Sequence, residues 1–155
     1  MTRPDDGRIR TAREDEATAL EDLMREASMI WDDHRADLLA HPEAIEVPRG
    51  DLRAGWVRVH ELEGTVTGFA TVRPLPDGSA ELDALFVRPA LMRGGIGARL
   101  VGDAARRARD GGAALLVVTA SPRAGAFYAR CGFRTVGEAP TRFGPALRMH
   151  LDLAS

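Results

Sequence analysis

Apolar residues recur at two different spacings along this 155-residue chain, and the spacing separates its helices from its strands. Helical spacing predicts one amphipathic helix over 14–31 and another over 96–109. Their apolar faces are formed by Ala17, Leu20, Leu23, Met24 and Ala27 in the first helix and by Ile96, Leu100, Val101, Ala104 and Ala108 in the second. The arginines of the second helix and Asp103 are expected on its opposite, polar face.

Strand-like runs account for much of the remaining chain. Residues 8–12 form a short strand candidate, and 55–74 contain two β-rich runs joined at the dipeptide 63–64, which is a hairpin signal. A turn at 76–78 leads into a third consecutive strand at 79–87. These runs predict an antiparallel meander of three strands.

A continuous apolar run, AALLVVTA at 113–120, is typical of a strand that is buried on both faces. With the strand at 79–87 and the helix at 96–109 it forms a βαβ unit, so the two strands are expected to be parallel neighbours. By contrast, the segment 32–52 mixes a short helix with a proline-punctuated loop and is expected to lie on the binding side of the fold.

The last third of the chain predicts a short helix over 123–131, with Ser121 as its N-cap and Gly132 just past its end. Two terminal strands follow at 133–139 and 146–153. The sequence contains no internal repeat and no boundary that would indicate a second domain.

Composition and charge narrow the function classes. A hydrophobic fraction of 45% is enough for one well-formed core, and a net charge of −2 gives no basic field for nucleic acid or an anionic membrane. All 21 basic residues are arginine, which excludes a Schiff-base lysine and the lysine of a nucleotide-binding P-loop. No His, Cys and carboxylate cluster has metal-ligand spacing, so no metal is expected.

The expected location is cytoplasmic. Cys131 is the single cysteine and cannot form an internal disulfide, and the first 15 residues are too charged for a signal peptide. No apolar run approaches the length of a membrane-spanning helix, so no membrane partner is expected. Cys131 itself is expected to fill core space rather than to act as a nucleophile.

The stretch RPALMRGGIGARL, residues 88–100, carries three glycines in four positions between a strand and a helix. Glycines allow the backbone to approach a ligand closely, and the free amides of a first helical turn favour an anion such as pyrophosphate. A ligand-free tight turn also needs glycine, so the loop alone leaves both interpretations open. The dinucleotide-binding fingerprint does not fit, because Arg99 and Leu100 stand where its third glycine is expected.

Two motifs together resemble the GNAT superfamily of N-acetyltransferases. The family motif Q/R-x-x-G-x-G/A opens a helix shortly after a strand, and here it matches Met92-Arg93-Gly94-Gly95-Ile96-Gly97, with methionine in place of the usual Gln or Arg. The later motif N-x-x-A-x-x-F-Y-x-x-x-G-F resembles residues 121–133, with Ser121 in place of Asn. The order of elements agrees with the family over residues 8–153.

The resemblance implies an α/β fold with a central mixed sheet over residues 8–155, preceded by a tail at 1–7. Its elements follow the order strand, two helices, three strands, helix, strand, helix and two strands. The parallel strands at 79–87 and 113–120 are expected to splay apart where the thioester binds.

The implied activity is acetyl transfer from acetyl-CoA, as co-substrate, to the amine of a small molecule or peptide by direct attack in a ternary complex. Backbone groups of Leu85, Phe86 and Val87 are expected to hold the pantetheine arm and polarise the thioester. The remaining cofactor-binding residues implied by the resemblance are Met92, Arg93, Gly94, Gly95, Ile96, Gly97, Ala98, Ser121 and Tyr128. Tyr128 matches the tyrosine that serves the family as general acid, although packing at a helix-strand seam is an alternative role.

A carboxylate on the strand 79–87 is the expected base. Glu81 has the spacing at which related enzymes carry theirs, Asp83 on the same face is the second candidate, and an exposed or capping role is open for both. A histidine such as His34, His41 or His60 is a weaker candidate, because a lone histidine is more often at the surface or partly packed.

Acceptor binding is expected near Trp31 and His34, where aromatic and acidic residues suit a cationic amine, although a core tryptophan beside a solvated acidic face fits equally well. Three alternatives stay open: a non-catalytic sensor or interaction module that binds coenzyme A, an enzyme that uses another acyl donor, and a hydroxyl acceptor. A homodimer is common in the family, but the sequence indicates no interface.

Overall fold

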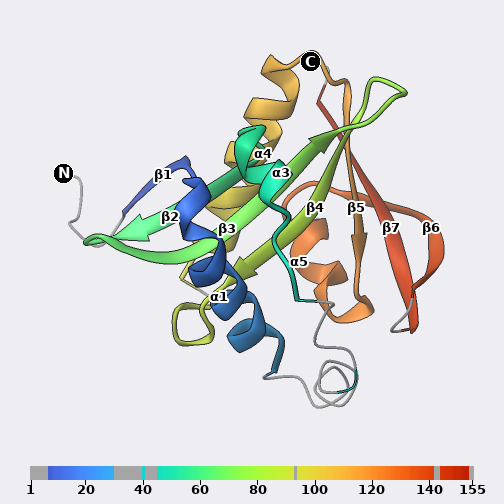
Figure 1. Ribbon diagram of the computed structural model, residues 1–155. Coiled ribbons are helices and arrows are strands. Elements are labelled where there is room, and N and C mark those ends of the chain that lie inside the picture. Colours follow the sequence, from blue (N-terminus) through green and yellow to red (C-terminus); the bar gives the residue numbers. More distant parts are fainter. Residues whose placement is uncertain (1–6, 30–39, 41–44, 93, 142–143, 154–155) are drawn as a thin grey trace. The chain divides into compact units, whose positions relative to one another are not determined.

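The computed structural model describes residues 7–29, 40, 45–92, 94–141 and 144–153 (Figure 1). Seven described strands form a mixed sheet in the order β1-β2-β3-β4-β5-β7-β6, which confirms the predicted α/β class. The strands are β1 Arg8–Thr11, β2 Val57–Leu62, β3 Thr65–Pro74, β4 Ala80–Val87, β5 Leu115–Ala120, β6 Arg134–Thr141 and β7 Gly144–Asp152. The α-helices are α1 Ala17–Met29, α3 Arg49–Arg53, α4 Ile96–Asp110 and α5 Gly125–Arg130.

The chain divides into two compact units. The first comprises residues 1–71 and 84–100, and the second comprises 72–83 and 101–155. β3, β4 and α4 each contribute residues to both units.

In the first unit, β1 pairs antiparallel with β2, and β2 pairs antiparallel with β3. Glu63 and Gly64 between β2 and β3 have φ values of 49° and 82°, so both central residues of the predicted hairpin turn take the left-handed conformation that a type I′ turn requires. The apolar face of α1 packs on this sheet as its spacing predicts. The buried cluster consists of Ala12, Ala17, Leu20, Leu23, Val47, Leu52, Val57, Val59 and Phe69.

A β-bulge interrupts the pairing of β2 with β3. His60 pairs with Gly68 whereas Glu61 pairs with Val66, so Thr67 is one extra residue on β3. A bulge re-aims the side chain at its position and is common near functional sites. At this bulge the hydroxyl of Thr67 lies within hydrogen-bond distance of the His60 ring.

In the second unit, β4 runs parallel to β5 through the pairs Ala80↔Leu116, Glu81↔Val117 and Leu82↔Val118, as the βαβ pattern predicts. β7 pairs antiparallel with both β5 and β6. The central residues of β5 are at most 6% exposed, which confirms a strand buried on both faces. Splaying of the two parallel strands stays a prediction.

The helix α4 differs from its sequence prediction at one position. Its predicted apolar face is buried, but Asp103, expected on the polar face, is only 5% exposed. The reason is geometric, because Asp103 follows Leu100 by three residues and precedes Ala104, so helical spacing places it beside the apolar stripe. The guanidinium of Arg106 lies 3.9 Å from its carboxylate.

The helix α5 begins later than predicted. Ser121 is the N-cap of a short 3-10 turn at Pro122–Ala124 and makes no side-chain capping bond, whereas α5 itself begins at Gly125 with Ala124 as its N-cap. Gly132, with a φ of +102°, ends it. No helix in the described ranges is long and apolar enough to cross a bilayer.

Candidate active site

The glycine loop leads from the end of β4 to the beginning of α4. After a 3-10 turn at Pro89–Leu91, Met92 is extended with φ −63° and ψ 151°. Gly95 has a φ of +87°, in the left-handed region that favours glycine, so the turn into α4 requires a residue without a Cβ. A Cβ built on Gly95 would meet no described atom within 4 Å. Among the described residues, the space beside Gly95 is therefore open.

The N-terminus of α4 is suited to an anion. The first amides of a helix have no intrahelical acceptor, and the helix dipole gives this end a partial positive charge. The first turn of α4 contains no acidic residue that would compensate this charge, and Arg99 adds a cation in the second turn. Gly94, Gly95 and Ala98 are exposed, whereas Gly97 is partly buried and Ile96 is buried.

The strand that precedes this loop is held close to β3. A Cβ added to Gly68 would lie 2.8 Å from the carbonyl oxygen of Phe86 and 3.3 Å from Cγ2 of Val87. Phe86 also stacks at a tilt on Phe69, with ring centroids 5.6 Å apart. The side chains of Leu85–Val87 are partly buried, as expected for residues that would contribute backbone groups and otherwise pack.

Arg88 fixes the residue that directly follows this strand. Its backbone nitrogen donates to the carbonyl oxygen of Thr67 at 2.9 Å, and its Nε donates to the carbonyl oxygen of Val66 at 2.9 Å. Its Nη1 also donates to Glu26 of α1 at 3.1 Å. Sequence reasoning missed this residue, because both side-chain partners are far away in the sequence and no local pattern indicates them.

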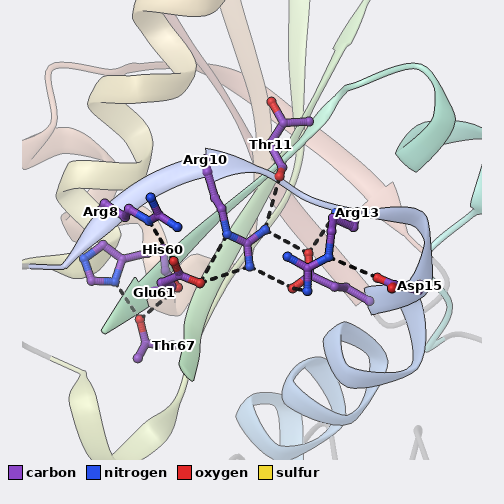
Figure 2. A network of polar contacts seen from close by, with 9 residues as sticks. Arg8, Arg10, Thr11, Arg13, Asp15, His60, Glu61 and Thr67 are labelled. Atoms are coloured by element: carbon purple, nitrogen blue, oxygen red, sulfur yellow. Dashed lines mark hydrogen bonds and ion pairs between the residues drawn. The ribbon is translucent and has the colours of Figure 1, made fainter. Parts of the chain in front are cut away.

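A polar network joins β1 and β2 to the start of the first helix. Figure 2 shows the Arg10 guanidinium between Glu61 and the segment that carries Arg13 and Asp15. Arg10 donates through Nη1 and Nη2 to the two carboxylate oxygens of Glu16, each at 2.9 Å, and the backbone nitrogen of Arg13 donates to Glu16 at 2.8 Å. These bonds, first of all those from Arg10, lower the pKa of Glu16 to about 2.

Glu61 completes the network from β2. It accepts from Arg8 at 2.7 Å and from Arg10 at 3.1 Å, and the hydrogen bond from Arg8 is the largest cause that lowers its pKa. Neither the network nor its members were singled out from the sequence, because the partners of Arg10 lie on separate elements. The network ties β1 to β2 and to the beginning of the first helix.

Tyr128 lies in the second unit and is only 7% exposed. Its ring makes edge contacts with Phe127 and Phe133, at centroid distances of 5.1 and 5.4 Å. Burial raises the pKa of its phenol, so the group stays protonated at neutral pH and can donate a proton or a hydrogen bond but cannot act as a tyrosinate base. Burial likewise raises the pKa of Cys131, which disfavours a nucleophilic thiolate as expected.

The two candidate carboxylates differ in their surroundings. Asp83 is exposed, and its Oδ2 lies 3.5 Å from Nη2 of Arg73. Glu81 is partly buried, and it pairs with Val117 of the parallel strand β5. The sequence patterns did not single out Arg73. The alternation of side chains along β3 could have indicated which face of the strand it lies on.

His60 differs from its prediction. It was expected at the surface or partly packed, but it is 0% exposed. Its bulge neighbour supplies the reason, since Thr67 turns its hydroxyl toward the ring and satisfies one nitrogen. Three further candidates, Trp31, His34 and Arg93, lie outside the described residues, as does His41. Among the described residues, no group of three or more His, Cys, Asp and Glu side chains could hold a metal ion.

Solved structures with this fold include several N-acetyltransferases. The PaiA N-acetyltransferase of Thermoplasma acidophilum, in complex with coenzyme A, matches with a TM-score of 0.76 and 16% identity over 94% of this chain and 98% of that one. The ribosomal-protein-alanine N-acetyltransferase of Brucella melitensis matches with 0.70 and 26% identity over 94% and 99%. An aminoglycoside 6'-N-acetyltransferase complexed with coenzyme A matches with 0.71 and 16% identity over 96% and 98%.

Comparison at the level of sequence gives a more specific result. No curated protein matches this chain significantly. The family model described as "Acetyltransferase (GNAT) family" matches residues 17–133, which is well over half of the chain and includes both motifs discussed above. The chain belongs to the acetyltransferase (GNAT) family.

Proposed function

We propose that this protein transfers the acetyl group of acetyl-CoA to the amine of a small molecule or peptide. The observation that carries the proposal is the conformation of the glycine loop, where Gly95 turns left-handed into a helix whose first turn has no acidic residue. Such a loop suits the pyrophosphate of coenzyme A. Membership of the acetyltransferase family and the coenzyme A in two of the solved relatives support the same ligand.

Binding of the cofactor is assigned to the backbone. The amides around Gly95, Ile96 and Gly97 would donate hydrogen bonds to the phosphate oxygens, and Met92, Arg93, Gly94 and Ala98 would flank them in the same motif. Met92 is 42% exposed and offers no hydrogen-bond donor, so binding would depend on main-chain groups more than in relatives with Gln or Arg there. Backbone groups of Leu85–Val87 would hold the pantetheine arm, and Ser121 would contribute from the beginning of the next helix.

The reaction needs a neutral amine, a stabilised oxyanion and a proton for the leaving thiolate. Acetyl-CoA supplies an activated acyl group as its thioester. The amine nitrogen forms a bond to the carbonyl carbon while the carbon–sulfur bond breaks. We assign Glu81 to the removal of the amine proton, directly or through water, and Tyr128 to donation of a proton to the sulfur.

The structural surroundings of these two residues support their roles. Tyr128 is held in its protonated form by burial, which a proton donor requires. Glu81 is preferred to Asp83 because the carboxylate of Asp83 is already ion-paired with Arg73 and is thereby less available to an acceptor amine. The acceptor is left as an amine, since the solved relatives include enzymes named for an aminoglycoside and for a ribosomal protein.

The proposal is tested by measuring thiol release from acetyl-CoA in the presence of a panel of amines, amino acids and peptides, followed by the mass of the product. Turnover with a product heavier by one acetyl group is expected for at least one amine. Binding of acetyl-CoA without turnover on any acceptor would favour a non-catalytic coenzyme A sensor instead. Activity only with a longer acyl donor, or only with a hydroxyl acceptor, would revise the acyl or acceptor class.

A further inference from the structure

His60 is a fully buried histidine whose two ring nitrogens both have partners on other elements. Nδ1 lies 2.6 Å from the hydroxyl oxygen of Thr67 on β3, a contact that Figure 2 shows. Nε2 lies 3.1 Å from Nη1 of Arg99 in the second turn of α4. His60 therefore connects the sheet to the helix that follows the glycine loop.

The hydrogen bonds around the ring assign its tautomer. The Thr67 hydroxyl donates to the carbonyl oxygen of His60 at 3.2 Å, so it must accept from Nδ1, which then carries the proton. Arg99 can only donate, so Nε2 must accept. A proton on Nε2 would place an N–H donor and a positive charge against the Arg99 guanidinium. His60 is consequently neutral in this arrangement.

The β-bulge makes this arrangement possible. In regular pairing neighbouring residues alternate between the faces of a sheet, but the extra residue at Thr67 lets its hydroxyl meet the ring of His60. The carbonyl oxygen of Thr67 also accepts a hydrogen bond from the backbone nitrogen of Arg88, which directly follows β4. Gly68, next along β3, lies so close to α4 that an added Cβ would be 3.2 Å from Cδ1 of Leu100. The bulge thus supports both the strand end and the beginning of α4.

Arg99 brings a cation to the end of α4 where the helix dipole is positive. Its backbone nitrogen donates to Gly95 within the helix, so the guanidinium and the amides of the first turn would act on the same anion. The residue is exposed, and its guanidinium carries several N–H donors, one of which meets Nε2 of His60. A guanidinium held in one orientation loses less entropy when it binds a phosphate.

We propose that His60 is a positioning residue for the cofactor, which holds the Arg99 guanidinium at the N-terminus of α4 so that Arg99 binds a phosphate of coenzyme A. The proposal rests on the proposed binding of acetyl-CoA by the glycine loop. It adds a side-chain contribution to a site that otherwise consists of main-chain amides, and in this chain Met92 supplies no such donor.

Two substitutions of His60 distinguish its contact with Thr67 from its contact with Arg99. His60→Asn keeps a polar group at the level of Nδ1, facing Thr67, but is too short to reach Arg99. His60→Gln places an amide oxygen near the position of Nε2 and can still accept from Arg99. Calorimetric titration with coenzyme A is expected to give about a tenfold weaker affinity for His60→Asn, the size of one charge-assisted hydrogen bond, and an affinity within about threefold of wild type for His60→Gln.

Arg99→Met removes the guanidinium itself, at a position that is exposed. It is expected to weaken coenzyme A binding by about tenfold, and the double variant with His60→Asn by no more than that, because both remove one interaction. Arg107→Met, an equal charge change at an exposed position in the last turn of α4, is the matched control and should leave the affinity unchanged. Thermal unfolding of each variant separates weak binding from loss of the fold.

The possible outcomes distinguish this proposal from the proposed function. If wild type binds coenzyme A and Arg99→Met binds equally well, Arg99 has no role at the phosphates and the positioning proposal fails while the function stands. Losses that add in the double variant, or a loss in His60→Gln as large as in His60→Asn, would also overturn it. If wild type does not bind coenzyme A at all, the proposed function fails and this inference fails with it.

Discussion

Arg73 on β3 and Asp83 on β4 form an ion pair in the second unit, with 3.5 Å between Nη2 and Oδ2. Asp83 lies on the same strand as Glu81 and two residues further along, so the two carboxylates are the natural alternatives for the base. The arginine occupies the carboxylate of Asp83 and makes it less available to an acceptor amine. The ion pair therefore ranks Glu81 first.

Replacement of Glu81 by glutamine is expected to lower kcat/KM for the acceptor by about a hundredfold, the usual contribution of a general base. Activity should recover in part at high pH, where more of the acceptor amine is already neutral. Asp83→Asn is the matched substitution, and it should reduce kcat/KM by less than about threefold. Steady-state rates of both variants with the best amine from the panel check the ranking. A larger effect at Asp83 would transfer the role to that residue.

Replacement of Tyr128 by phenylalanine is expected to lower kcat by about ten- to a thousandfold with little change in acetyl-CoA affinity. The ring contacts with Phe127 and Phe133 are retained in this variant, so packing changes little. Single-turnover rates and calorimetry measure the two quantities separately. A variant with wild-type turnover would assign Tyr128 to packing alone.

The ionisation of Tyr128 can be observed directly, because it is the single tyrosine of the chain. Burial raises its pKa above the ordinary value near 10, so the folded protein should show no tyrosinate absorbance at a pH where the unfolded chain does. The same pKa shift makes stability depend on pH in the alkaline range. Below pH 10 both states are protonated and nothing is lost, whereas above it the unfolded state releases its proton first and stability declines. Ultraviolet titration of native and urea-unfolded protein tests this order.

The elements that sequence patterns predicted correctly are those set by local spacing. The hairpin at Glu63 and Gly64 needs only two residues that tolerate a positive φ, and the parallel pairing of β4 with β5 follows from an apolar run after an amphipathic helix. The family motifs located the glycine loop because the residues of each motif are contiguous in the sequence.

The features that were missed depend on contacts between distant segments. The bulge at Thr67 changes which side chain meets His60, and nothing in either strand alone indicates the extra residue. Without the bulge, a lone histidine in β2 gives no sign of complete burial. Asp103 was misplaced for a related reason, since a charged residue was assumed to face solvent although its spacing from Leu100 placed it near the apolar stripe.

The ion pair of Arg10 with Glu16 is expected to make the free energy of unfolding depend on pH in the acidic range. The pKa of Glu16 is lowered to about 2 from an ordinary value near 4.5, so its contribution is fully present above pH 4.5 and is lost as the pH falls toward 2. Glu16→Gln should therefore lower the free energy of unfolding by about 1–2 kcal/mol at pH 7, after allowance for solvent screening, and by less at pH 3. Urea denaturation at the two pH values measures the difference.

Asp15→Asn serves as the control for this prediction. Asp15 is exposed and pairs at 3.3 Å with the exposed Arg13, so its replacement should change stability by less than about 0.5 kcal/mol at either pH. Equal losses in the two variants would mean that the network adds nothing beyond surface charge. A loss in Glu16→Gln that grows toward pH 3 would contradict the direction of the pKa shift.

The glycine loop gives the most direct test of cofactor binding. Gly95→Asp adds a carboxylate to the space where the cofactor's pyrophosphate is expected, and it should weaken acetyl-CoA binding by at least about a hundredfold, because several charge-assisted contacts are lost together. Gly97→Asp is expected to act in the same direction from the first turn of α4. Calorimetry with acetyl-CoA measures both.

Backbone strain has to be separated from the added charge, and Gly78 offers the control. Gly78 and Gly95 share a φ of +87°, and a Cβ on either would meet no described atom within 4 Å, so an aspartate at each position costs a similar strain of about 1–2 kcal/mol. Gly78 lies in the turn between β3 and β4, outside the loop. Gly78→Asp should therefore lose comparable thermal stability and keep its affinity for acetyl-CoA. If Gly95→Asp retains the affinity of Gly78→Asp, the loop does not bind the cofactor, and a different anion or no ligand must explain its conformation.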